Sequence, residues 1–170
     1  MVWSWRPRPR KEYVSGEGFF YLGRSYRLRI VAGQAGSPPL QLHRGWFELQ
    51  QDLVSEARGH FIRWYTSRLR PVLQRTVARF TGRVDEGPVN LHVQDMGYRW
   101  DSTDRRGHLY FHWRVAMLPF PMIEYVAAHE LTHLTEREHA ERFWQRLERL
   151  VPDYQERRRW LELEGARYDL

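Results

Sequence analysis

The segment that decides the fold is residues 125–139, Tyr-Val-Ala-Ala-His-Glu-Leu-Thr-His-Leu-Thr-Glu-Arg-Glu-His. Within it, His129 and His133 are four residues apart, and on a helix this spacing places both side chains on one face, with Cβ atoms about 5–6 Å apart. Two imidazoles so arranged can bind one Zn²⁺ ion through Zn–N bonds of about 2.0–2.1 Å. The H-E-x-x-H pattern is the helix signature of zinc peptidases, so the sequence predicts a zinc site here.

Glu130 is the expected catalytic residue of this segment. It is turned by about 100° around the helix from His129, which brings its carboxylate beside the metal as a general base for a bound water. Glu130 also falls within the apolar stripe that contains Ala127 and Leu131, where an unpaired charge is unfavourable. A carboxylate facing a metal-bound water explains that position, and a buried Glu–Arg ion pair is the alternative.

His139 is the expected third ligand. It follows His133 after a short polar segment that can turn the chain back toward the metal. Three histidines and one water form a catalytic zinc site, whereas a structural zinc normally has four protein ligands. The spacing equals that of metzincins, but Glu136 stands at their glycine position and no Met-turn follows, which excludes that assignment. The alternative for His139 is a polar residue at the start of the next helix.

Hydrophobic periodicity predicts the remaining elements. Residues 19–31 alternate as a β-hairpin that turns at Gly23. Apolar residues at three- to five-residue steps predict helix from about Trp46 to Phe80, divided at Gly59 or Pro71. Further strands are predicted over residues 89–94 and 108–113, a polar loop over 101–107, and helices over 122–136, 140–150 and 153–164.

Length and composition indicate one soluble globular domain. The 170 residues suffice for one substantial core, and we expect residues 1–12 to be a disordered basic tail and residues 13–170 to form the domain. The chain has no cysteine, so any metal must be held by His, Asp or Glu. No stretch is typical of a signal peptide or a transmembrane helix. We therefore expect a cytoplasmic protein with no membrane partner.

The basic charge has two explanations. The formal net charge is +6, and Lys11 is the only lysine, so nearly all of the positive charge is arginine. The arginines are mostly interleaved with Glu and Asp, which favours genome composition or heat adaptation. A phosphate-binding face is the second explanation, and it predicts weak nucleic-acid binding.

The sequence resembles the YgjP-like metallopeptidases, relatives of the WLM and SprT-like proteins. The resemblance covers roughly residues 20–165 and is most specific over residues 122–161. It rests on the segments 125–134, 138–144 and 151–161, and upstream on residues 21–30, 99–100 and 107–114. It implies an α+β minimal zincin, in which a small antiparallel or mixed sheet packs on the H-E-x-x-H helix between flanking helices. It also implies zinc ligation by His129, His133 and His139.

Departures from the family concern the substrate side. The family usually continues Arg-Trp with Gly-Ser-Cys-Ser, whereas Trp100 is followed here by Asp101-Ser102-Thr103-Asp104, and a common Asn of the next strand appears as His112. His108 and His112 alternate with apolar residues and are expected to face solvent. If their strand lines the cleft, His112 is a candidate for stabilising the oxyanion. The other candidates are Tyr98, Arg99 and Arg114.

The predicted function is zinc-dependent hydrolysis of peptide bonds in peptide or protein substrates. Zinc lowers the pKa of its water and polarises the carbonyl, while Glu130 takes the proton and passes it to the leaving amine. An edge strand, His108 to Trp113, is expected to bind an extended peptide by β-augmentation. One alternative is a DNA-associated protein, or a protease acting on DNA-bound proteins, which arginines clustered on one face would favour. The other is a metal-dependent hydrolase of a non-peptide substrate, which a narrow, closed cleft would favour.

Overall fold

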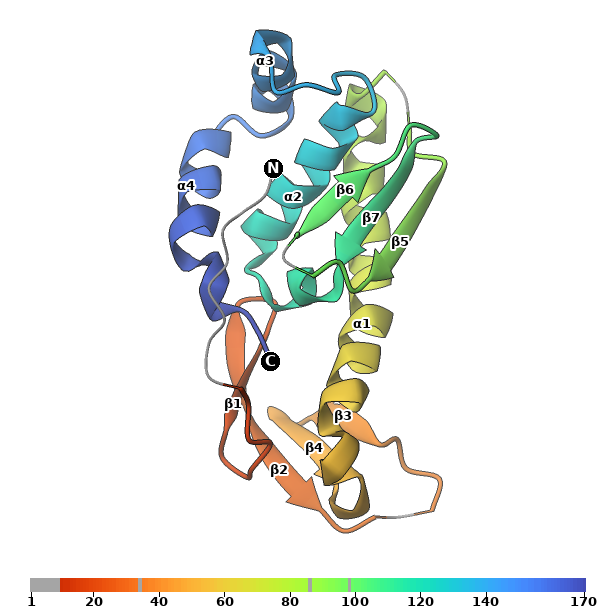
Figure 1. Ribbon diagram of the computed structural model, residues 1–170, viewed down its shortest axis with the longest axis vertical. Coiled ribbons are helices and arrows are strands. Elements are labelled where there is room, and N and C mark those ends of the chain that lie inside the picture. The colour runs from red at the N-terminus through yellow and green to blue at the C-terminus, as the bar shows by residue number, and fades with distance from the viewer. Residues whose placement is uncertain (1–9, 34, 86, 98) are drawn as a thin grey trace.

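The computed structural model describes residues 10–33, 35–85, 87–97 and 99–170 (Figure 1). Within them the chain forms two small sheets and four α-helices, which confirms the predicted α+β class. The predicted tail of residues 1–12 lies mostly outside the described residues. Lys11, inside them, donates from Nζ to the carbonyl of Gly18 at 2.7 Å.

The first sheet precedes the long helix in the chain. It contains β1 (Gly18–Tyr21), β2 (Arg24–Val31), β3 (Leu40–His43) and β4 (Trp46–Gln50), in the order β1-β2-β4-β3. The predicted hairpin is confirmed as the antiparallel pair β1 and β2. Its turn needs Gly23, which has φ +81° and would place a Cβ only 2.9 Å from the Cα of Pro119. This close contact docks the hairpin on the segment that leads into helix α2 (Phe120–His133).

The helix predicted from Trp46 is wrong for its first residues, which form β4. Phe47 and Leu49 are fully buried and alternate with three half-buried residues, the two-residue period of a strand. β4 pairs with β2 in parallel and with β3 in antiparallel orientation. As an interior strand it bonds its backbone on both sides, and this tertiary pairing outweighs the local helical spacing. Strand β3 itself had no counterpart in the sequence prediction.

Helix α1 (Ala57–Phe80) is continuous, although Gly59 and Pro71 predicted a division. A proline inside a helix is unfavourable by about 3 kcal/mol. Leu69 and Val72, on either side of Pro71, are both buried, so one apolar face continues through the proline and its packing keeps the helix intact. The first half of α1 packs on the first sheet, where Phe61 stacks on Phe19 with ring centroids 4.2 Å apart.

The second sheet lies against the other half of α1 and against α2 (Figure 1). It contains β5 (Asn90–Gln94), β6 (Asp101–Thr103) and β7 (His108–His112), in the order β5-β7-β6. β5 and β7 are parallel, and β6 and β7 are antiparallel. The polar loop predicted over residues 101–107 is therefore wrong for β6, whose three residues are too few to show a period. The expected edge strand is also wrong, because β7 pairs on both sides and the edges are β5 and β6.

Three helices complete the domain: α2, α3 (Glu141–Leu150) and α4 (Tyr154–Glu164), close to the predicted ranges. Short 3-10 helices span Gln51–Glu56, Thr81–Arg83, Trp113–Met117 and Gly165–Arg167. Helix α2 lies between α4 on one side and α1 with the second sheet on the other (Figure 1), so ten of its 14 residues are buried. Among the described residues, no helix is both long and apolar enough to cross a membrane.

Candidate metal centre

Helix α2 brings two of the three histidines to its C-terminal end. The helix ends at His133, and the amide of Glu136 then donates to the carbonyl of Thr132 at 2.9 Å. The carboxylate of Glu136 accepts from Arg146 Nε of α3 at 3.1 Å. Glu136 does not have a positive φ, so this turn does not need the glycine that metzincins place there. The turn returns the chain so that His139 faces the end of α2.

The Nε2 atoms of His129, His133 and His139 lie 3.1–3.2 Å from one another. Tetrahedral zinc with Zn–N bonds of about 2.0–2.1 Å has about 3.3–3.4 Å between neighbouring ligand atoms. The three nitrogens therefore have nearly the spacing of three corners of a zinc tetrahedron. The residues present fit the metal that the sequence predicts, with one corner left for a group from outside the protein.

The three imidazoles are in the protonation state that a metal requires. His133 Nδ1 lies 3.0 Å from the carbonyl of Glu136, and because a carbonyl only accepts, Nδ1 holds the proton and Nε2 has the free lone pair. Burial, followed by the charges of the other two histidines, lowers the pKa of His129 to about 2. Burial also lowers the pKa of His133, and lowers that of His139 to about 4. All three rings are neutral near pH 7, as metal ligands must be.

Phe143 supports the three rings from α3. It is fully buried, and its ring centroid lies 4.9 Å from that of His129, 4.5 Å from that of His133 and 4.6 Å from that of His139. Next to it, Trp144 Nε1 donates to the carbonyl of His139 at 3.1 Å. Sequence reasoning placed both aromatic residues only in an amphipathic helix. The available signal was their position in the sequence, four and five residues after His139, which on a helix is about one turn away.

Glu130 points toward strand β6. Its side chain is only 2 % exposed, and the Thr103 hydroxyl donates to its carboxylate. Burial, followed by the neighbouring charge of Asp101, raises the pKa of Glu130, and burial raises the pKa of Asp101 to about 6. Among the described residues no arginine pairs with Glu130, so the structure gives no support to the Glu–Arg alternative. Thr103 and Asp101 were not predicted, because their segment was interpreted as a loop.

A cleft of about 580 Å³ opens beside the histidines. Glu130, His133 and His139 line one side of it, and β6 with the turn after it lines the other. The edge of β6 has free backbone groups: His112 N donates to Trp100 O at 2.8 Å, and Asp104 N donates to His108 O at 3.1 Å. Since alternate residues of an antiparallel strand bond to the same neighbour, the amides and carbonyls of Asp101 and Thr103 face away from β7.

Comparison with known proteins gives a family for this geometry. The profile of the YgjP-like, metallopeptidase domain family matches residues 4–164. The chain belongs to the YgjP-like metallopeptidase family. Among solved structures, the metallopeptidase zymogen abylysin of Pyrococcus abyssi matches at 18 % sequence identity and a TM-score of 0.49, over 55 % of this chain and 95 % of that chain. No curated protein matches the sequence.

The structure separates the four oxyanion candidates of this YgjP-like metallopeptidase. Arg99 is exposed and lines the cleft beside the histidines. Tyr98 lies outside the described residues. His112 and Arg114 do not line the cleft.

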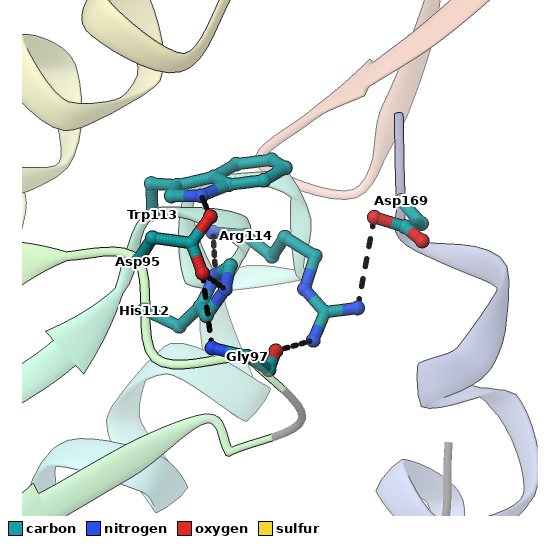
Figure 2. Close-up of polar contacts among 6 residues, drawn as sticks. All are labelled: Asp95, Gly97, His112, Trp113, Arg114 and Asp169. Carbon is teal, nitrogen blue, oxygen red and sulfur yellow. Dashed lines mark hydrogen bonds and ion pairs between the residues drawn. The ribbon is translucent and has the colours of Figure 1, made fainter. Parts of the chain in front are cut away.

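His112 and Arg114 instead belong to a polar cluster at the far end of β7 (Figure 2). His112 is 2 % exposed, so the expectation that it faces solvent is wrong. Its Nδ1 accepts from the amide of Arg114 at 3.0 Å, and its Nε2 lies 3.4 Å from Asp95. Arg114 donates to the carbonyl of Gly97 at 3.0 Å and pairs with Asp169 at 3.6 Å. Polar side chains are tolerated in this interior site because they satisfy one another's hydrogen-bonding groups and charges. Their contacts join the second sheet to the C-terminal segment.

Proposed function

We propose that this metallopeptidase is a zinc hydrolase in which His129, His133 and His139 hold the metal and Glu130 is the general base. The mutual spacing of the three Nε2 atoms is the observation that carries the proposal, because it matches a tetrahedral zinc site. Their depressed pKa values support it further, since neutral imidazoles bind Zn²⁺ without first losing a proton.

The residues around the centre have separate roles in the proposed reaction. When bound, zinc supplies Lewis acidity, which polarises a carbonyl and makes water acidic near neutral pH. Glu130 accepts the proton of the attacking water and delivers it to the leaving amine. The Thr103 hydroxyl orients the Glu130 carboxylate, and Phe143 holds the imidazoles in place. Arg99 is the remaining candidate for stabilising the oxyanion, since it alone among the described candidates lines the cleft.

A peptide is the substrate that the cleft favours over a small non-peptide molecule. Asp101 and Thr103 direct free amides and carbonyls along the outer edge of β6, and both residues line the cleft. An extended peptide can pair with such an edge as an additional strand. A cleft of about 580 Å³ along a strand edge also differs from the narrow, closed cavity expected of the non-peptide alternative.

The nucleic-acid alternative receives less support. On the C-terminal helices, Arg146, Arg157 and Arg158 pair with carboxylates at 2.9–3.1 Å, so this surface has mixed charge. The arginines that line the cleft have no such carboxylate partners among the described residues, and the same cleft also contains the buried carboxyl groups of Asp101 and Glu130. Weak, salt-sensitive nucleic-acid binding stays a hypothesis, and salt-dependent affinity for DNA would test it.

The proposal is tested with zinc content and peptide cleavage measured on the same proteins. Wild type should carry about one zinc per chain, and His139→Ala should lose it to a chelator. Glu130→Gln should keep its zinc and lose about 10²–10⁴ in cleavage rate of a peptide library. Glu156→Gln, which changes an exposed carboxylate of α4, is the matched control and should behave as wild type. Loss of zinc from Glu130→Gln, or equal cleavage by that variant and wild type, would refute the assigned roles.

A further inference from the structure

Four arginines surround the cleft of the metal centre. Arg99 precedes β6, Arg105 and Arg106 lie in the turn between β6 and β7, and Arg137 lies in the turn between α2 and α3. All four are exposed. They therefore come from three separate segments and border the cleft at both ends of β6 as well as beside His139.

Within the described residues, none of these four guanidinium groups forms an ion pair or a side-chain hydrogen bond. The cleft does contain carboxylates, but these are engaged elsewhere. Asp104 Oδ1 accepts from the amides of Arg106 and His108 at 2.8 and 3.0 Å, and its Oδ2 accepts from the Tyr110 hydroxyl at 3.2 Å. Both oxygens thus accept from donors in residues 106–110, the turn and the start of β7, and the guanidinium groups of the four arginines keep their hydrogen-bonding capacity.

The remaining two carboxylates lie in the floor of the cleft. Asp101 is 9 % exposed and Glu130 is 2 % exposed, and the two carboxyl groups interact with each other, while Thr103 donates to Glu130. A ligand that enters the cleft meets exposed guanidinium groups first and buried carboxylates last. Guanidinium groups bind carboxylates and phosphates as paired donors, so the rim selects an anionic ligand.

The geometry favours a peptide over a nucleic acid as that anion. The free edge of β6 offers backbone amides and carbonyls, which a peptide backbone can pair with. A nucleic-acid strand has no backbone amides with which to pair along this edge. A peptide can pair with the edge of β6 and place its anionic side chains against the four arginines.

We propose that the four cleft arginines select peptide substrates with Asp or Glu side chains on both sides of the scissile bond. Arg99 serves the side that pairs with the start of β6, and Arg105 and Arg106 serve the side beyond its end. Arg137 adds charge next to the histidines. This specificity rests on the proposed peptidase function, because it assumes that the β6 edge binds the substrate backbone.

Binding tests the specificity without requiring turnover. The zinc-loaded Glu130→Gln protein is titrated with labelled peptides that alternate Ala with Glu, Gln or Lys, and with a single-stranded oligonucleotide. Exposed ion pairs strengthen binding by about two- to fivefold each, so two pairs should make the Glu peptide bind about 4- to 25-fold more tightly than the Gln peptide. The Lys peptide should bind most weakly, and the Glu preference should shrink as salt rises.

Substitutions identify the residues responsible. In the same background, Arg105→Gln with Arg106→Gln should lower the Glu-over-Gln preference by about two- to fivefold for each ion pair that is lost. The separate variant Arg137→Gln tests a second segment of the chain in the same way. Arg75→Gln with Arg159→Gln, two exposed arginines outside the cleft, is the matched control and should keep the preference. Urea unfolding verifies that each variant is folded. Arg99 is left unchanged in this test, because it is also the oxyanion candidate.

The results distinguish this inference from the proposed function. Equal binding of the Glu and Gln peptides, or tighter binding of the oligonucleotide than of the Glu peptide, overturns the specificity. The same holds if the control variant loses the preference as strongly as the cleft variant. A protein that cleaves library peptides without regard to charge keeps its peptidase function and loses this inference. A protein that binds the Glu peptide through Arg105 and Arg106 but cleaves nothing supports the inference and contradicts the peptidase function.

Discussion

Replacing His112 by Asn should make the protein less sensitive to acid. His112 is buried in the cluster of Figure 2, and burial, followed by the charge of Arg114, lowers its pKa to about 4. Its Nδ1 accepts the Arg114 amide, so protonation would remove an acceptor as well as bury a charge. Asn retains an acceptor near the Nδ1 position but does not titrate. The resemblance to the family also makes Asn a residue that this position accommodates.

The magnitude follows from the two pKa values of the imidazole. In the unfolded chain the pKa is about 6.5, and in the folded chain it is about 4. Between these values the unfolded state binds more protons, so the free energy of unfolding decreases as the pH falls. The decrease begins near the unfolded pKa and levels off below the folded one. From about pH 7 to about pH 5 it amounts to about 2 kcal/mol for this one group.

Urea unfolding of wild type and His112→Asn at both pH values measures this difference. Both proteins are kept with chelator, so that His129, His133 and His139 titrate alike and cancel in the comparison. Wild type should lose about 2 kcal/mol more than the variant on acidification. Equal losses would show that His112 is not held neutral in the folded protein, and the placement of the ring between Asp95 and Arg114 would then be wrong.

Three further predictions concern the metal centre. Thr103→Val removes the hydroxyl that donates to Glu130 and should lower kcat/KM about 10- to 100-fold with zinc content unchanged, whereas Thr81→Val, at the end of α1, should leave peptide cleavage as in wild type. Phe143→Ala empties a fully buried position and should lower the free energy of unfolding by about 3–5 kcal/mol in urea titrations. Because burial lowers the pKa of all three histidines, that of His139 to about 4 and that of His129 to about 2, zinc should still be bound when the pH falls below about 6.5, the usual pKa of histidine, and elemental analysis after dialysis across a pH series would reveal earlier loss.

The sequence predicted the helices of this fold better than its strands. The ranges of α3 and α4 follow from apolar residues that repeat within one segment, and local periodicity suffices for them. Strand β4 was missed because Trp46 and Leu49 also fit a helical spacing, and only its pairing with β2 and β3 decides between the two. Strand β6 was missed because its three residues form a strand only by pairing with β7.

The same distinction between local and distant contacts applies to the site. His129, Glu130 and His133 are arranged by one helix, so their spacing in the chain predicts their spacing in space. The assignment of His112 to a solvent-facing position failed for the opposite reason. Its strand alternates as expected, and the amide of Arg114, two residues further along the chain, donates to its ring. Asp95 approaches the other ring nitrogen from a separate segment and makes the interior position favourable, and no local pattern predicts that contact.

The division between helix and strand indicates how this enzyme can change its substrate without changing its proposed chemistry. The three histidines and Phe143 belong to α2, α3 and the turn between them. A second set, Arg99, Thr103 and the adjacent Arg105 and Arg106, belongs to β6 and its flanks. The departures from the family, Asp101 to Asp104, fall on this second set. Under the proposed function, substitutions there would alter the charge and the edge that a peptide meets, while the geometry of the three histidines is held by packing on α2 and α3. Thr103 and Asp101 link the two sets, because they contact Glu130, so changes at these two positions should affect rate and specificity together.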